Sequence, residues 1–177
     1  LDKPEEANRI YVAGLEAELG RSQSVEAAVI LAMDGVYGSD GKLDEARTEF
    51  LISNDHLFAS IAGKKKMLPG VSINPARRDA SAELDRCAAK KAALVKVLPN
   101  AMAFDPAEER FRPYYRRLGE LEIPLLSHIG FEYSLIGHDQ SVGNPERLIP
   151  ALDEGATVIA AHGCSRGFFL GEPHQKT

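Results

Sequence analysis

Five short apolar runs recur along the chain, with longer charged segments between them, and this rhythm constrains the fold more than any other feature. The runs do not alternate polar and apolar residues. Continuous apolar runs of this length are typical of strands buried on both faces, as in a parallel sheet. The runs occupy residues 26–35, 66–75, 92–100, 123–130 and 156–163.

The segments between the runs carry helix signals. Asp105 stands before a proline as an N-cap, and Pro113 ends that turn and restarts a helix. Asn144, before another proline, repeats the helix start, and Gly155 suits its end. Strands and helices in alternation predict an α/β fold of βαβ units, in one domain that spans residues 1–177 without a linker. The expected helices lie within 3–20, 42–66 (one or two helices), 79–92, 105–111, 113–120 and 144–155.

Composition argues against several classes of function. The chain has 177 residues, a net charge of −5 and 44% hydrophobic residues, which fits one soluble globular domain. Its lysines and arginines are scattered, apart from a run at 63–66, so no nucleic-acid surface is expected. No apolar stretch reaches the roughly 20 residues that span a bilayer, and no export signal is evident, so no membrane partner is expected. With Cys87 and Cys164 as its cysteines, we expect reduced thiols and a cytoplasmic protein.

Two of the apolar runs end in a histidine that glycine follows closely. His128 ends the run at 123–130, and His162 ends the run at 156–163. Functional side chains of parallel α/β folds lie at the carboxyl ends of strands, so these two imidazoles are expected to converge. Neutral imidazole is the commonest protein ligand of divalent metals. The pair therefore predicts a metal site, against the alternative of two structural histidines held by hydrogen bonds.

Other polar residues follow the strands at the same rim. Asp34 ends the first run and is a candidate catalytic group, with an ordinary Asp-Gly turn as the alternative. Asn74 and Arg77 follow the second run and are candidate substrate contacts, because an arginine there can fork onto a substrate carboxylate. A solvated loop arginine is the alternative. Glu132 and Tyr133, just past His128, are expected to line the pocket by their position.

The endings PLLSHIG and AAHG are distinctive together, and they stand in longer stretches that read FRPYYRRLGELEIPLLSHIG and NPERLIPALDEGATVIAAHG, with LPNAMAFDP before them. Over roughly residues 66–165 the chain resembles the amidohydrolase superfamily, specifically the amidohydrolase-related branch of metal-dependent hydrolases, which also holds certain decarboxylases. The resemblance implies a (β/α)8 TIM barrel of which this chain covers part, about strands two to six. It also implies that His128 is a metal ligand, and that His162 is a second ligand or the base that orients the attacking water.

The chain departs from that family in two places. The His-x-His of the family's first strand and the Asp ligand of its last strand are absent from this sequence. The resemblance thus implies that residues beyond Leu1 and Thr177 supply these ligands, or that the site is lost. Lys96 falls on the strand where other branches of the superfamily carry a carbamylated lysine that bridges two metals, a role uncommon in the resembling branch. An ion pair with a neighbouring carboxylate is its alternative.

We therefore predict an enzyme, a metal-dependent hydrolase that directs a metal-activated water at a C–N, ester or lactone bond of a small molecule. The divalent ion is expected to be zinc by ligand preference, with manganese as the alternative. The metal ligands are predicted to be His128 and His162, and the catalytic residues His162 and Asp34. Two alternatives stand beside this: metal-dependent decarboxylation of a small carboxylic acid, and a non-catalytic α/β module. Because a partial barrel exposes sheet edges, assembly into a homo-oligomer is a further alternative.

Overall fold

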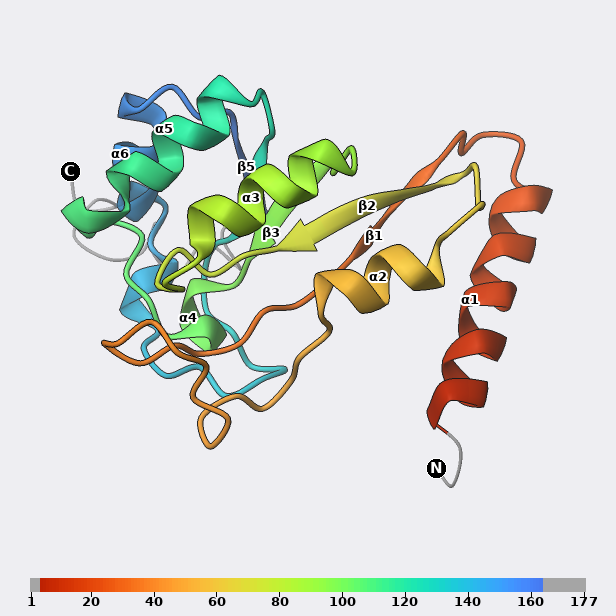
Figure 1. Cartoon of the computed structure of the whole chain (residues 1–177), viewed down its shortest axis with the longest axis horizontal. Coiled ribbons are helices and arrows are strands. Elements are labelled where there is room, and N and C mark those ends of the chain that lie inside the picture. Colours follow the sequence, from red (N-terminus) through yellow and green to blue (C-terminus); the bar gives the residue numbers. More distant parts are fainter. Residues whose placement is uncertain (1–3, 164–177) are drawn as a thin grey trace.

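A computed structural model describes residues 4–163, which form an α/β fold around one parallel sheet (Figure 1). The described residues contain five strands in the spatial order β1-β2-β3-β4-β5, and every neighbouring pair is parallel. Each strand lies inside one of the five predicted runs, so the positions and the parallel pairing of the strands are confirmed. Burial on both faces holds for β3 in the middle of the sheet, whereas the edge strands β1 and β5 have no fully buried residue. The strands are β1 Ala28–Leu31, β2 Met67–Ser72, β3 Leu94–Val97, β4 Leu125–His128 and β5 Val158–Ala161.

Helices connect the strands, and most begin where the sequence predicts. Residues 4–163 contain the α-helices α1 Pro4–Arg21, α2 Asn54–Ser60, α3 Ala80–Ala89, α4 Pro99–Met102, α5 Arg112–Glu120 and α6 Ile149–Asp153. Three short 3₁₀ turns are Glu109–Phe111, Ser141–Gly143 and Pro145–Leu148. The predicted helix starts at Asn144 and Pro113 are confirmed: the Asn144 side chain accepts a hydrogen bond from the Glu146 amide, and Pro113 lies in the first turn of α5. No helix within residues 4–163 has the length and hydropathy to cross a membrane.

Two expected helices are shorter than predicted. Between residues 42 and 66 only α2 is helical, and it begins after Ser53, whose hydroxyl accepts from the His56 amide. Just before Ser53, Ile52 instead forms an isolated antiparallel bridge with Met33, in the segment that follows β1. At 105–111 the Asp105 carboxylate accepts from the Ala107 amide, as an N-cap does, but only a 3₁₀ turn follows.

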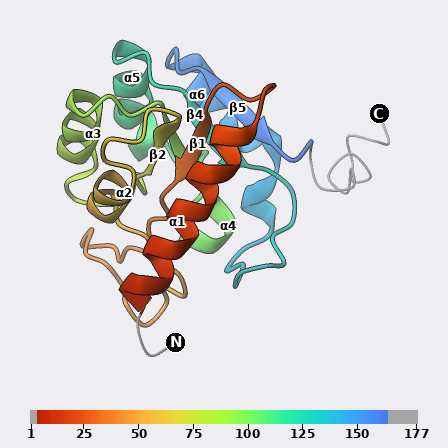
Figure 2. The ribbon, with the colours of Figure 1, turned by 90° about the vertical axis from the view of Figure 1, so that its right-hand side faces the viewer.

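The hydrophobic core fills the space between the helices and one face of the sheet. Alternate residues of the central strands, such as Val71, Val95 and Leu125, are almost fully buried and belong to one cluster with Leu84 of α3 and Leu118 of α5. Figure 2, seen from the α1 end, shows α2, α3 and α5 together on one side of the strands. The remaining residues of each strand therefore point to the other face of the sheet, away from these helices.

That second face is apolar and partly exposed at its flanks. It carries Val29 and Leu31 of β1, Leu68 of β2 and Ile159 of β5, which are 37 to 43% exposed. Within residues 4–163, β1 pairs only with β2 and β5 only with β4, so the sheet is open at both edges. The α/β class is thus confirmed, and the described residues show an open five-stranded sheet.

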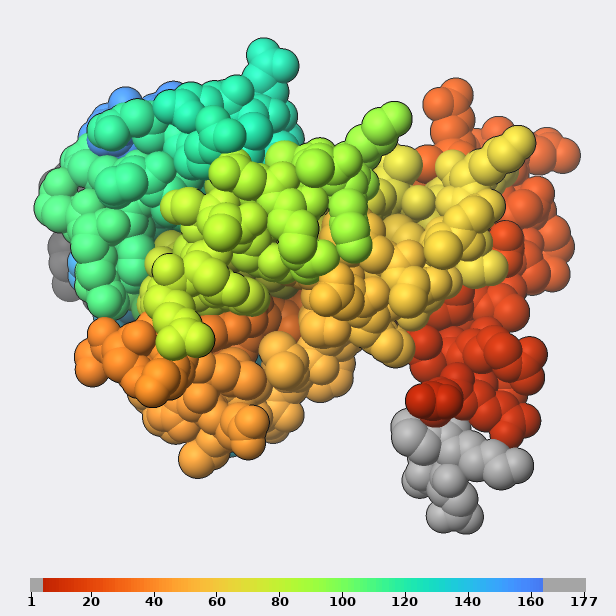
Figure 3. All heavy atoms as spheres, viewed as in Figure 1, coloured from red at the N-terminus to blue at the C-terminus, as the bar shows by residue number. Residues whose placement is uncertain are grey.

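Helix α1 lies at the β1 end of the sheet, against the loop that leads into β2 (Figure 3). Lys66 Nζ donates to the Leu19 carbonyl oxygen at 2.8 Å, and Lys64 pairs with Glu16. Val12 is the α1 residue that enters the core. The predicted opening helix is therefore confirmed, and it packs at one end of the layer of helices.

Alanine substitutions at two helical glycines are expected to change the free energy of unfolding in opposite directions. A methyl group on Gly119 of α5 would lie 2.9 Å from the Gly155 carbonyl oxygen, whereas one on Gly14 of α1 meets nothing within 4 Å. We expect Gly119→Ala to lower the free energy of unfolding by about 1–3 kcal/mol through overpacking against backbone. Gly14→Ala should raise it by about 0.5–1 kcal/mol through helix propensity. Urea denaturation of both variants measures this; stabilisation by Gly119→Ala would contradict the close approach of α5 to residue 155.

Candidate functional site

The two histidines singled out by the sequence lie side by side at the carboxyl ends of neighbouring strands. His128 is the last residue of β4 and pairs in register with Ala161, so His162 follows directly beside it. Their ring centroids are 4.9 Å apart and the rings are tilted by 54°. His162 has a φ of 67°, in the left-handed region, which turns the chain sharply at the end of β5. The predicted convergence of the imidazoles is confirmed.

His128 is poised as a neutral imidazole. Its side chain is 6% exposed, and burial lowers its pKa, helped by the nearby Lys96 and His162 and opposed by Glu132. Its Nδ1 lies 3.7 Å from Glu132 Oε2, too far for a strong hydrogen bond but close enough for the carboxylate to orient the ring. Its Nε2 is buried and has no hydrogen-bond partner among residues 4–163. Such an atom is costly unless a ligand completes it.

Glu132 is held in place by the loop that follows β4. Its Oε1 accepts hydrogen bonds from the amides of Ser134 and Leu135. Its own amide donates to Gln140 Oε1 at 2.9 Å, and the Asn100 side chain of α4 donates to the same oxygen at 3.0 Å. The carboxylate is therefore committed to its loop and to His128, and α4 anchors that loop.

Lys96 is a buried cation on the same face of the sheet as His128. It stands in β3 opposite Leu126, and alternation turns both Lys96 and His128 away from the helices. The lysine is 6% exposed, and its Nζ has no hydrogen-bond partner in the described part of the chain. Burial lowers its pKa to about 8, with partial compensation by Glu132. Among residues 4–163, Lys96 forms no direct ion pair. Glu132, the carboxylate that acts on its pKa, binds its own loop and faces His128.

A metal ion would find two nitrogen donors here. Within residues 4–163, no group of three or more His, Cys, Asp or Glu side chains is arranged to hold an ion. The fit therefore rests on His128, whose partnerless Nε2 is a free donor atom, and on the exposed His162 beside it. A catalytic zinc site uses about three protein ligands and an open position. The described residues thus offer two nitrogen atoms to such a site, fewer than the ligands that it needs.

Asp34, predicted as a catalytic residue, is fully hydrogen-bonded within the fold. Its Oδ1 accepts from the Tyr37 hydroxyl at 2.8 Å and from the Gly35 amide at 2.9 Å. Its Oδ2 accepts from the Asn74 amide at 2.8 Å and from Arg77 at 3.3 Å. At 5% exposure, the carboxylate ties the loop after β1 to the loop after β2. Its geometry is that of an architectural group at the rim.

The predicted substrate contacts have different surroundings from those expected. Arg77 forks onto Asp79 with two hydrogen bonds of 2.9 Å and also pairs with Asp34, so protein carboxylates occupy its guanidinium, and its pKa is raised. Asn74 is fully buried and donates to the carbonyl oxygens of Gly35 and Met102. The Tyr133 side chain is 81% exposed.

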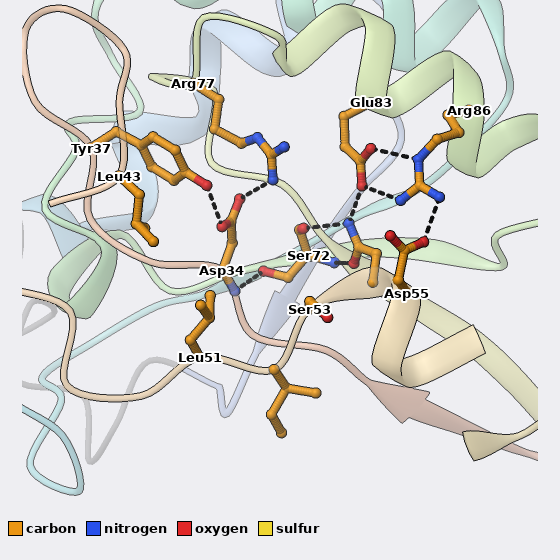
Figure 4. Close-up of a pocket in the computed structure, with 12 residues that line it drawn as sticks. Asp34, Tyr37, Leu43, Leu51, Ser53, Asp55, Ser72, Arg77, Glu83 and Arg86 are labelled. Atoms are coloured by element: carbon orange, nitrogen blue, oxygen red, sulfur yellow. Dashed lines mark hydrogen bonds and ion pairs between the residues drawn. The ribbon is translucent and has the colours of Figure 1, made fainter. Parts of the chain in front are cut away.

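A pocket of about 320 Å³ lies beside the Asp34 network (Figure 4). Figure 4 shows a second network at the same pocket, in which Arg86 binds Glu83. Asn54 Nδ2 also donates to Glu83 Oε1, at 2.7 Å. Arg86 also reaches Asp55 at 2.6 Å. The i,i+3 spacing of Glu83 and Arg86 in α3 is the one local sign of this network in the sequence, since Asn54 and Asp55 come from a distant segment. Every charge drawn around the pocket already has a partner of opposite sign.

We expect Lys96→Met to stabilise the chain at pH 7. Burial lowers the lysine pKa from 10.5 to about 8, and one unit corresponds to about 1.4 kcal/mol, so the buried ammonium costs about 3 kcal/mol. Between pH 8 and 10.5 the folded chain has released this proton while the unfolded chain still binds it, so the wild type gains stability as the pH rises. The advantage of Lys96→Met should therefore shrink over that range. Urea denaturation at several pH values measures it, and a destabilised variant at pH 7 would contradict the unpaired cation.

No protein-family model matches this chain, and no curated protein matches it closely enough to be its relative. The resemblance to the amidohydrolase superfamily therefore rests on the motifs that end in His128 and His162. The structure adds where those motifs lie, at the carboxyl ends of two neighbouring parallel strands. The family and the activity that follow from it are proposals.

Proposed function

We propose that the chain is part of a (β/α)8 barrel and acts as a metal-dependent hydrolase of the amidohydrolase-related type. The observation that carries this proposal is the pairing of His128, whose buried Nε2 has no partner among residues 4–163, with the adjacent ring of His162. His128 would hold a divalent cation, zinc by ligand preference, and His162 would bind it or take the proton of the attacking water. The bond attacked is a C–N, ester or lactone bond of a small molecule.

The side chains around the pair suit these roles. A bound divalent cation supplies Lewis acidity, which makes water nucleophilic near neutral pH. His128 is held neutral by burial, which is the form that ligates metals, and the Glu132 carboxylate lies 3.7 Å from its Nδ1. His162 is exposed, so its ring is open to solvent.

Two features of the sheet support closure into a barrel. The face that bears Lys96 and His128 also bears apolar side chains at its flanks, among them Leu31 and Ile159, which are 40% and 43% exposed. Edge strands with open backbone groups are normally paired or covered. Further strands beside β1 and β5 would satisfy the edges and enclose these side chains, as a barrel does. A second copy of the chain would be the other way to cover them.

Decarboxylation of a small carboxylic acid is the second candidate at the same site. The observation that favours it is Lys96, a buried cation with no partner in the described residues, on the same face as His128. Such a cation suits a substrate with a carboxylate.

The first prediction of this proposal concerns metal content. We expect about one zinc per wild-type chain after incubation and dialysis, and loss of that zinc in His128→Ala, because the buried imidazole is its anchor. His56→Ala, which removes an exposed histidine of α2, serves as the matched control and should keep the ion. Elemental analysis measures the ratio, and circular dichroism checks the fold. Absence of zinc and of manganese from the wild type would make the histidines structural and leave the non-catalytic module.

The second prediction concerns Glu132. Its carboxylate raises the pKa of His128, so Glu132→Gln should lower that pKa further, while the neutral amide keeps the shape of the side chain. Loss of the orienting charge should also weaken zinc binding by about 10- to 100-fold. NMR titration of the His128 ring in metal-free protein measures the first effect and a competitive chelator assay the second. If neither the His128 pKa nor the zinc affinity changed, Glu132 would have no role at the metal site.

A further inference from the structure

The charges near the histidine pair leave one cation unbalanced. Lys96 is 6% exposed and its Nζ has no hydrogen-bond partner among residues 4–163. The carboxylate that acts on it electrostatically, Glu132, is bound by two amides of its own loop and faces His128. A buried charge is normally paired, because an unpaired one costs several kcal/mol. The missing counter-charge points to a ligand.

We propose that the site takes a substrate that carries a carboxylate, and that Lys96 Nζ binds this carboxylate beside the His128–His162 pair. The inference deepens the proposed function, since it takes the histidine pair as the place of the reaction. It gives Lys96 a role in substrate recognition rather than in the chemistry itself. Binding of the carboxylate needs no metal, so it can be tested independently of the proposed hydrolase activity.

The sheet register places the three residues within reach of one small molecule. Lys96 is opposite Leu126, and His128 lies two residues farther along β4 on the same face. With strands about 4.8 Å apart and a rise of about 3.3 Å per residue, the two Cα atoms are about 8 Å apart. The effect of Lys96 on the pKa of His128 agrees with this proximity. A substrate carboxylate on Nζ would hold the adjoining bond near the imidazoles.

A single carboxylate matches the site better than a more highly charged anion. The described residues offer one unpaired cation here, an ammonium, with the neutral His128 near it. Phosphate groups are usually bound by several cations or by arginine forks. Arg77, which the sequence suggested for a substrate carboxylate, is already forked onto Asp79 and paired with Asp34. We therefore assign the binding of the substrate carboxylate to Lys96 instead of Arg77.

Access to the lysine requires a local movement. Lys96 Nζ and His128 Nε2 are both closed off from solvent in this conformation. Binding at these atoms therefore requires neighbouring side chains to move aside, and the exposed ring of His162 lies against His128. A small ligand is therefore the suitable probe.

The test compares two ligands of matched shape, propionate and propionamide, on chelator-treated protein at pH 7 in buffer free of bicarbonate. Chemical-shift titration of the whole chain gives both dissociation constants. We expect the wild type to bind propionate at least about tenfold more tightly than propionamide. Lys96→Met, which is expected to fold stably, should lose that preference. Lys65→Met, which removes an exposed lysine, should keep it.

Three results would overturn the inference. The first is a wild type with no preference for propionate, and the second is a preference that survives in Lys96→Met. The third is a carbon dioxide adduct on Lys96, detected by mass spectrometry in bicarbonate buffer, because the anion would then be a carbamate of the lysine itself. Failure of the hydrolase proposal has another signature: zinc binding would be absent while the Lys96-dependent preference for propionate remains.

Discussion

The parallel register of β3, β4 and β5 is the constraint on which the candidate site depends. It sets Lys96 opposite Leu126 and His128 opposite Ala161, and so aligns the ends of the strands that carry both histidines. Side chains alternate along a strand, so a slip of one residue would turn Lys96 into the helix-covered core. The buried valines and leucines of the other face make such a slip costly. The packing of the core therefore determines which polar groups meet on the opposite face.

The two halves of the rim are electrostatically different. After β1 and β2, Asp34 and Arg77 are saturated by partners from the same loops, and their charges hold the loops together. Near the carboxyl ends of β3 and β4, Lys96 and His128 each keep a buried atom without a partner among residues 4–163. Native structures leave few buried polar atoms unsatisfied. The paired groups, Asp34 and Arg77, stabilise the fold. The unpartnered atoms of Lys96 and His128 are the ones that a ligand could satisfy.

Much of the fold could be predicted because buried parallel strands leave continuous apolar runs, and all five strands lie inside such runs. The limits of the prediction lie where distant parts of the chain decide the structure. The segment before Ser53 has helical composition but forms a bridge with Met33, a contact that no local pattern reveals. The convergence of His128 and His162 could be predicted from strand order alone. The hydrogen bonds that occupy the Asp34 carboxylate could not be predicted, because its partners come from two separate loops.

Lys96 shows why a site is harder to predict than a fold. In the sequence it is one lysine in an apolar run, and nothing local distinguishes an ion-paired lysine from an unpaired one. The difference arises because Glu132 is captured by its own loop, which Gln140 and α4 hold in place. That loop both orients His128 and withholds a counter-charge from Lys96. A buried lysine without a counter-charge lowers the stability of the folded chain, so Lys96 is better suited to binding an anion than to holding the fold together.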